Sequence, residues 1–350
     1  MAATRVLVVD DSTTMRALFA NALESSKEIV VVGAASGADE AREMIAALRP
    51  DVVTLDVEMP GMNGVDFLRE LMATRPIPVV MLSTLTQKGA DISLRAIELG
   101  AVDCFAKPQR ATMDEFGRIA GRLCKVVLTA GRTNLAARRR AAPVAAAPVA
   151  VGAGDYAWRG ELLGVVGGMG SIDAATELLA ALPANCPPVI AALAIDEGLG
   201  VPFAARLSRT AAARVKLAAD GDTLEPGTIH IAVDPARHVV VDRWPNGKLR
   251  LVDRALVGGV RPSADLLFAS IARTAGDMAI GVVLSGGGQD GAQGIAAIRN
   301  AGGTCLAQDP ATALVADMIE AAVARGVSAL ASPAQLAALA CPARSIDVAA

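Results

Sequence analysis

The chain has 350 residues, of which 53% are hydrophobic and only 20% are charged. This length exceeds one typical compact unit, so we expect two domains, each with its own core. The 33 basic and 36 acidic residues nearly cancel, which gives no electrostatic case for nucleic acid or an anionic membrane. Five scattered cysteines without a C-x-x-C pair, and no apolar stretch of membrane-spanning length, predict a cytoplasmic protein without membrane insertion.

Short β-branched runs alternate with amphipathic helical patterns over the first part of the chain. The runs cover residues 6–9, 29–32, 52–55 and 79–82, and turn residues bound them, which predicts buried strands. Between them, apolar residues recur at helical spacing, as in the set Met15, Leu18, Phe19 and Ala22. Helices that cross between parallel strands make a doubly wound α/β unit, which we place at residues 1–128.

Composition changes after a helical pattern at residues 113–129. The following segment contains Arg138, Arg139 and Arg140 and then prolines among small residues, which predicts an exposed linker at 129–157. We interpret the three arginines as a solvated charge run rather than a docking patch.

A second α/β domain is predicted at residues 158–345. Strands are expected at 162–166, 189–193, 280–284 and 304–306, with helices near residues 173, 201, 263, 291 and 312. Residues 228–252 contain strand-like runs broken by Asp234-Pro235 and Pro245-Asn246-Gly247, which suits antiparallel hairpins attached to a parallel sheet.

Three carboxylates are predicted to converge at one rim of the first sheet. Ligands bind beyond the carboxyl ends of parallel strands, where the first and third strands deliver Asp10, Asp11 and Asp56. Such close like charges repel each other unless a hard cation neutralises them, which implies Mg²⁺. Asp56 can then attack a phosphoryl donor while Lys107 supplies a cation for the phosphoryl oxygens. Helix capping before Ser12 would explain one acid, but not three acids and a lysine.

Ser83 ends the fourth predicted strand, where its hydroxyl would meet a new phosphoryl oxygen and make the site a switch. The phrases VLVVDDS, DVVTLDVEMPGMNG, VVMLST and AKP resemble, in this order, the receiver domains of two-component response regulators over residues 4–125. The resemblance implies a flavodoxin-like (βα)5 fold and phosphorylation of Asp56 by a histidine kinase. It also implies a magnesium site and a switch pair, made respectively by Asp10, Asp11, Asp56 and the Glu58 backbone, and by Ser83 and Lys107.

One position departs from the receiver pattern. Many receivers carry an aromatic residue three positions before the lysine, and this chain has Cys104 there, with Phe105 beside it. The sequence therefore does not predict how phosphorylation of Asp56 is transmitted from the first domain.

The remaining motifs resemble the CheB family of chemotaxis methylesterases. The receiver phrase LSTLTQKGADISLRAIELGAVDCFAKPQ is closer to a CheB receiver than to a generic one. The phrases DGDTLEPGTIHIA, VRPSADLLFASIA, GVVLSGGGQDGAQGIAAIRNAGG and LAQDPATALV resemble the protein-glutamate methylesterase domain over residues 160–340. This resemblance implies hydrolysis of glutamyl methyl esters on chemoreceptors, and deamidation of certain glutamines, by a Ser-His-Asp triad on an α/β fold.

Two of the three triad positions hold residues that cannot do this chemistry. The family's serine lies in a GASTGG turn, where this chain reads VVGGMGSID, so Gly168 takes its position, or Met169 with a one-residue shift. The histidine position, in VIAALAIDEG, is Ala194. Glycine has no side chain and a thioether has no proton to lose, so both nucleophile and base are absent. Only Asp290, in GGGQDGAQG, matches the family's aspartate.

Three other residues are candidate substitutes for the missing nucleophile. Ser171 lies in the same turn, and Ser285 and Cys186 are near in sequence. The chain has just two histidines, His230 and His238, both in the hairpin region. For His238 a surface or packing role is favoured over that of a relocated base.

These patterns predict a CheB-like response regulator whose output domain is catalytically degenerate and acts by binding or as a phosphate sink. The alternative is an active, receiver-gated methylesterase or glutamine amidase with a nucleophile outside the family pattern, such as Ser171. The expected cofactor is Mg²⁺, and the expected partners are a chemotaxis-type histidine kinase and methyl-accepting chemoreceptors.

Overall fold

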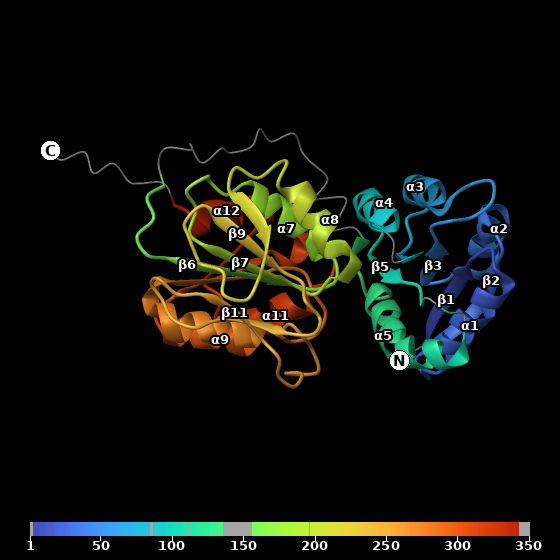
Figure 1. Cartoon of the computed structure of the whole chain (residues 1–350). Helices are drawn as coiled ribbons and strands as arrows, with labels where there is room; N and C mark the ends of the chain where they lie inside the picture. The colour runs from blue at the N-terminus through green and yellow to red at the C-terminus, as the bar shows by residue number, and fades with distance from the viewer. Residues whose placement is uncertain are drawn as a thin grey trace. The chain divides into compact units, whose positions relative to one another are not determined.

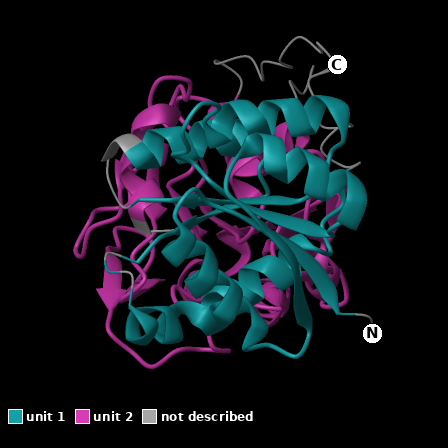
Figure 2. Cartoon of the chain, turned by 90° about the vertical axis from the view of Figure 1, so that its right-hand side faces the viewer, with its two compact units in different colours: residues 1–138 teal, residues 139–350 magenta. Residues whose placement is uncertain are grey.

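The computed structural model describes residues 3–84, 87–108, 110, 112–135, 156–195 and 197–342. The chain divides into two compact units, Met1–Arg138 and Arg139–Ala350, which Figure 2 shows in different colours. The run Arg138–Arg140 lies outside the described residues, as does most of the proposed linker. Helix α5 (Met113–Ala130) passes the proposed linker start, and Tyr156 is already buried, with its carbonyl accepting from Asn185 Nδ2 (2.6 Å). The linker would therefore begin later and end earlier than the predicted range 129–157.

The first unit is a five-stranded parallel sheet with helices on both faces. Its elements are β1 (Thr4–Val9), α1 (Thr13–Glu24), β2 (Ile29–Ala35), α2 (Ala38–Leu48), β3 (Val52–Asp56), α3 (Gly64–Thr74), β4 (Val79–Ser83), α4 (Gln87–Leu99), β5 (Asp103–Ala106) and α5. The strand order is β2-β1-β3-β4-β5. Helices α3 and α4 lie on one face and α1 and α5 on the other (Figure 1).

Local sequence explains where the first unit's helices begin. Ser12, Asn63 and Thr112 stand at the N-caps of α1, α3 and α5, and each side chain accepts a backbone N–H of the first turn. Because Ser12 itself caps α1, capping does not explain the aspartates before it.

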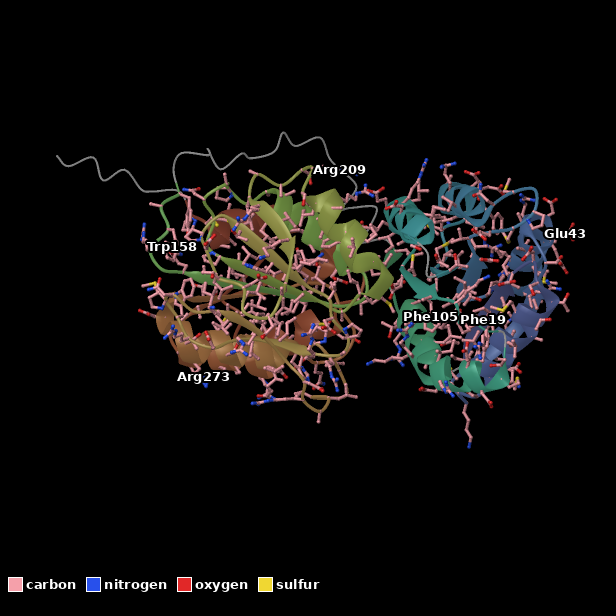
Figure 3. All side chains as sticks on the ribbon, in the orientation of Figure 1. Phe19, Glu43, Phe105, Trp158, Arg209 and Arg273 are labelled. Carbon is pink, nitrogen blue, oxygen red and sulfur yellow. The ribbon has the colours of Figure 1, made fainter. Side chains whose placement is uncertain are left out.

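The core of the first unit is apolar on both faces of its central strands. On one face the rings of Phe19 and Phe116 meet edge to face at 4.9 Å, and Phe19 and Phe105 both lie inside this unit (Figure 3). The central strands β3 and β4 are completely buried, as predicted. Strand β2 is only partly buried because it lies at the sheet edge, so the expectation of four buried strands was wrong there.

The second unit is built on a seven-stranded parallel sheet in the order β14-β13-β12-β6-β7-β9-β8. Its strands are β6 (Leu162–Gly167), β7 (Val189–Leu193), β8 (Arg214–Leu217), β9 (Thr228–Ala232), β12 (Ala279–Val283), β13 (Thr304–Gln308) and β14 (Ala329–Ala331). Its helices are α7 (Ser171–Ala180), α8 (Gly200–Leu207), α9 (Ala264–Ala275), α10 (Ala292–Asn300), α11 (Asp317–Val323) and α12 (Pro333–Ala340). Helices α7, α8 and α12 lie on one face, and α9 and α11 on the other (Figure 1).

The hairpin region differs in part from its prediction. Strands β10 (His238–Val241) and β11 (Leu249–Val252) form the expected antiparallel pair, and the Val241 N–H donates to Ser270 Oγ on α9 (3.0 Å). The first predicted run instead becomes β9, a parallel member of the main sheet between β7 and β8. Near Thr312 the chain forms only a short 3₁₀ turn (Pro310–Thr312). The two-domain α/β class is nevertheless confirmed.

The described helices include none with both the length and the apolar character needed to cross a membrane. All five cysteines are free and buried.

Candidate functional sites

Three aspartates meet where the strand order of the first sheet reverses, between β1 and β3. Asp10 follows β1 and is fully buried, Asp56 ends β3 and is 4% exposed, and Asp11 is exposed. One carboxylate oxygen from each lies within 4.8 Å of the others. Such a reversal point creates a crevice at the carboxyl ends of the strands, where ligands bind. The structure thus brings the three predicted acids together.

Lys107 lies between the two buried acids. Its Nζ is 2.7 Å from Asp10 Oδ2 and 2.7 Å from Asp56 Oδ2. Its backbone N–H donates to the Ser83 carbonyl (2.7 Å), so the ends of β4 and β5 together fix its position. One lysine does not neutralise three carboxylates, and the cluster retains negative charge that favours a further cation.

Burial raises the pKa of the Asp56 carboxyl above its ordinary value. The ion pair with Lys107 and the hydrogen bond from the Glu58 N–H to Oδ1 (3.3 Å) lower this pKa, whereas the charge of Asp10 raises it. The net effect is a raised pKa, so Asp56 ionises less readily than an exposed aspartate. Additional positive charge at the cluster would favour the carboxylate form that a nucleophile needs.

The oxygen donors of this cluster fit Mg²⁺, which prefers carboxylates, retains several waters and commonly bridges to phosphate. Asp10, Asp11 and Asp56 are the side chains that would hold the ion. A pocket of about 650 Å³ opens beside Asp11 and is also lined by Glu58, Arg69 and Arg95, among other residues. The pocket thus adjoins the cluster at Asp11. The Glu58 backbone as a ligand remains a prediction.

Gly64 allows α3 to begin directly against the phosphoacceptor strand. A Cβ at this position would lie 1.8 Å from the Asp56 carbonyl oxygen, and the Gly64 N–H donates to the Val57 carbonyl (3.0 Å). Any side chain would push the loop between β3 and α3 away from Asp56. Sequence reasoning did not single out this glycine, although it ends the quoted phrase DVVTLDVEMPGMNG.

Cys104 and Phe105, where the sequence departs from the receiver pattern, face different helices. Ser83 Oγ is 3.3 Å from the Gly89 carbonyl oxygen on α4, and Cys104 Sγ donates to the Ser93 carbonyl on the same helix (3.4 Å). Phe105 is buried, and the guanidinium of Arg122 on α5 lies 4.6 Å from its ring centre. Cys104 therefore faces α4, the helix that Ser83 Oγ also contacts.

In the second unit, the strand order reverses between β6 and β12. Gly168 follows β6 and is buried, and its N–H donates to the Ser285 carbonyl after β12 (2.9 Å). Ala194 follows β7, and its N–H donates to the Gly167 carbonyl (2.9 Å). The positions expected for serine and histidine are thus adjacent at the binding rim. Neither carries a reactive side chain.

Asp290 lies just before α10, and its carboxylate caps the start of α9. Its carboxylate accepts from Ser263 Oγ (2.9 Å), the Ala264 N–H (2.6 Å) and the Asp265 N–H (3.0 Å), all at the start of α9. Asp265 in turn accepts from the N–H groups of Gly291 and Gly294 at the start of α10 (2.9 and 2.8 Å). The two aspartates thus cap each other's helices. Sequence reasoning assigned Asp290 only as a triad member and missed this role.

The substitute nucleophiles are poorly placed for attack. Ser171 is fully buried, and among the described residues its hydroxyl has no hydrogen-bond partner, so no base adjoins it. Ser285 Oγ already donates to the Met169 carbonyl (2.9 Å) and accepts from the Val315 N–H (3.0 Å). Cys186 precedes β7, at the opposite end of that strand from the rim, and burial raises the pKa of its thiol to about 12.

Both histidines are interior residues. The Ser263 N–H donates to His238 Nδ1 (3.1 Å), so Nε2 carries the proton and donates to the Ala255 carbonyl (3.0 Å). His230 lies within β9 and is fully buried, and burial lowers its pKa. The packing role predicted for His238 agrees with its burial, and both of its nitrogens are occupied.

A sheet with an acidic phosphoacceptor-type crevice, followed by a second α/β domain, defines a response regulator with an output domain. Residues 6–115 match the model of the response regulator receiver domain, and residues 163–340 match the model of the CheB methylesterase. The chain belongs to the CheB methylesterase family.

Similar proteins cover nearly the whole chain. One from Caulobacter vibrioides, "Protein-glutamate methylesterase/protein-glutamine glutaminase 1", is 45% identical over 320 residues, which are 91% of each chain. One from Vibrio vulnificus, with the same name but number 2, is 40% identical over 327 residues, or 93% of each chain. The Thermotoga maritima CheB methylesterase catalytic domain, at 24% identity and a TM-score of 0.50, covers 52% of this chain and 98% of its own, and supports the fold.

Replacement of Gly64 by alanine should distort the phosphoacceptor loop. The new Cβ would overlap the Asp56 carbonyl, so we expect a loss of about 3 kcal/mol of unfolding free energy and much slower phosphorylation. Calorimetric unfolding and phosphoryl labelling measure the two effects. The matched control is Gly121→Ala on α5, because no atom of the described residues lies within 4 Å of a Cβ built there. Equal behaviour of both variants would contradict the role assigned to Gly64.

Asp290→Asn should destabilise the second unit even if that unit catalyses nothing. The amide cannot accept all three hydrogen bonds, and loss of a helix cap costs about 1 to 2 kcal/mol. Urea unfolding followed by the fluorescence of Trp158 and Trp244, the chain's two tryptophans, reports this unit alone. Exposed Asp277→Asn is the control. An unchanged midpoint for Asp290→Asn would show that the capping network is energetically irrelevant.

Proposed function

We propose that this CheB-type protein is phosphorylated on Asp56 by a chemotaxis-type histidine kinase in the cytoplasm. The supporting observation is the geometry of Asp10, Asp56 and Lys107, with both Nζ–carboxylate distances at 2.7 Å. The match to the receiver family supports the same conclusion.

In this proposal the side chains divide the work of phosphoryl transfer. The Asp56 carboxylate attacks phosphorus and forms an acyl phosphate, while the bond from phosphorus to the kinase histidine nitrogen breaks and its electron pair leaves with the imidazole. Lys107 exchanges part of its ion pair for a phosphoryl oxygen. A bound Mg²⁺ would supply the charge neutralisation that the raised pKa of Asp56 calls for. Ser83, 3.3 Å from the Gly89 carbonyl, would turn from α4 to the new phosphoryl group. That exchange would convert the chemistry into a change at α4.

For the second unit we propose binding rather than hydrolysis. Gly168 and Ala194 supply neither nucleophile nor base, Ser171 is buried, and the oxygens of Asp290 are occupied by α9. Loss of even one member of a Ser-His-Asp triad removes most of its rate acceleration, since its members act as a unit. The protein would then bind the methylated region of chemoreceptors, or act as a phosphate sink that accepts phosphoryl groups from the kinase.

A specific observation favours the alternative, an active methylesterase and glutaminase. The similar proteins from Caulobacter vibrioides and Vibrio vulnificus carry that activity in their names and align over at least nine-tenths of the chain. Under this alternative the nucleophile would be Ser171, the buried first residue of α7, and the start of this helix would have to move to expose it.

Phosphorylation is tested with acetyl phosphate labelled at phosphorus, in the presence of Mg²⁺. We expect the wild type to be labelled and Asp56→Asn to remain unlabelled, because an amide at the end of β3 cannot attack phosphorus as the carboxylate beside Lys107 can. Asp114→Asn, an exposed change on α5, should label normally. Undiminished label on Asp56→Asn would refute the assignment.

Methanol release from a methylated receptor fragment separates the two output functions. With the phosphodonor present, we expect release by the wild type to equal the background of Ser171→Ala, while the receptor fragment still binds in calorimetry. Ser208→Ala, an exposed change at the end of α8, controls for surface effects. Release by the wild type and Ser208→Ala, but not by Ser171→Ala, would establish the enzyme. Asp290 variants do not discriminate, because their fold is altered.

A further inference from the structure

Arg16 lies in the first turn of α1, and its side chain turns back toward the acidic rim. Its Nη1 donates to the Asp10 carbonyl (2.7 Å) and to the Asp11 carbonyl (2.9 Å), and its Nη2 donates to Thr13 Oγ1 (3.0 Å). One guanidinium thus holds two consecutive backbone carbonyls. Those carbonyls belong to two of the three residues whose carboxylates form the cluster.

The turn that Arg16 holds lies just beyond the last residue of β1. The Asp10 N–H still bonds to the Ala35 carbonyl of β2 (3.1 Å), but β1 ends at Val9. Beyond it the Ser12 N–H donates to Asp10 Oδ1 (2.9 Å), which fixes the Asp10 side chain. The exposed Asp11 is held from the carbonyl side, by Arg16. Fixing both peptide planes fixes the directions in which the two Cα–Cβ bonds leave the backbone.

We propose that Arg16 is a positioning residue for divalent-cation binding at this turn. The inference deepens the proposed phosphorylation of Asp56 and rests on it. Arg16 bonds to backbone oxygens, so it acts on the cation through the geometry of Asp10 and Asp11. Groups that orient metal ligands in this indirect way strongly affect metal affinity.

The sign of the effect separates positioning from simple electrostatics. A guanidinium so close to the cluster repels a divalent cation, so removing its charge alone would strengthen cation binding. Removing its hydrogen bonds would free the turn and weaken cation binding. The two roles therefore predict opposite changes for Arg16→Met, which removes both the charge and the donors.

The test is a titration of the full chain with Mn²⁺, in which free ion is measured by electron paramagnetic resonance and Mg²⁺ is then added as competitor. We expect Arg16→Met to bind both ions about tenfold more weakly. Arg16→Lys, which keeps the charge and one donor, should fall between that variant and the wild type. Arg118→Met, a change at an exposed arginine on α5, should bind as the wild type does. Equal or tighter binding by Arg16→Met would overturn the proposal.

Parallel measurements keep this inference separate from the proposed function. If the wild type accepts no label from acetyl phosphate, the phosphorylation proposal fails whatever the metal titration shows. If the wild type is labelled on Asp56 but the affinity of Arg16→Met is unchanged, only the role of Arg16 fails. Circular dichroism verifies folding, and if Arg16→Met does not fold, Arg16→Gln and Arg16→Lys are judged by the same titration. Wild-type affinity in both would then count against positioning.

Discussion

The first domain depends on the ion pairs by which Lys107 holds two buried carboxylates, Asp10 and Asp56, close together. Asp10 and Asp56 are nearly inaccessible to water, and Lys107 contacts both of them. Burial of unpaired charge is strongly unfavourable, so the arrangement exists only because the lysine is delivered between the acids by β5. The same balance leaves Asp56 with a raised pKa and the rim short of positive charge. The fold thereby prepares an affinity for a cation and for a phosphoryl group together.

In the second domain, as in the first, the expected binding site lies at the strand ends where the order of the sheet reverses, but different residues occupy it. The order of this sheet reverses between β6 and β12, yet Gly168 stands where a reactive side chain is expected. A Cβ at Gly168 would lie 3.3 Å from Gly286 Cα and 3.5 Å from Met318 Sδ. Met318 also packs so closely on Gly286 that a Cβ there would overlap its sulfur. A side chain at position 168 would therefore make a tight contact with the Gly286 backbone and an ordinary van der Waals contact with Met318.

Sequence reasoning worked where chemistry is tied to strand ends. The positions of Asp10, Asp11 and Asp56 at the ends of the first and third predicted strands were enough to predict one crevice, because parallel strands end on one edge. It failed where the outcome depends on partners distant in sequence. Nothing in the run 228–232 shows that it pairs with β7 and β8 rather than folding back as a hairpin. The exposure of β2 likewise follows from its edge position, which periodicity does not encode.

The capping role of Asp290 changes how its retention is understood. A triad aspartate in isolation suggested a remnant of catalysis, but three donors from α9 satisfy this carboxylate, and Asp265 returns the interaction to α10. Leaving those donors unpaired in a partly buried site would be costly whether or not the domain hydrolyses esters. The presence of Asp290 is therefore weak evidence for activity. Gly168 and Ala194, the positions predicted for the serine and the histidine, bear more directly on catalysis, because neither residue has a side chain that could act as nucleophile or base.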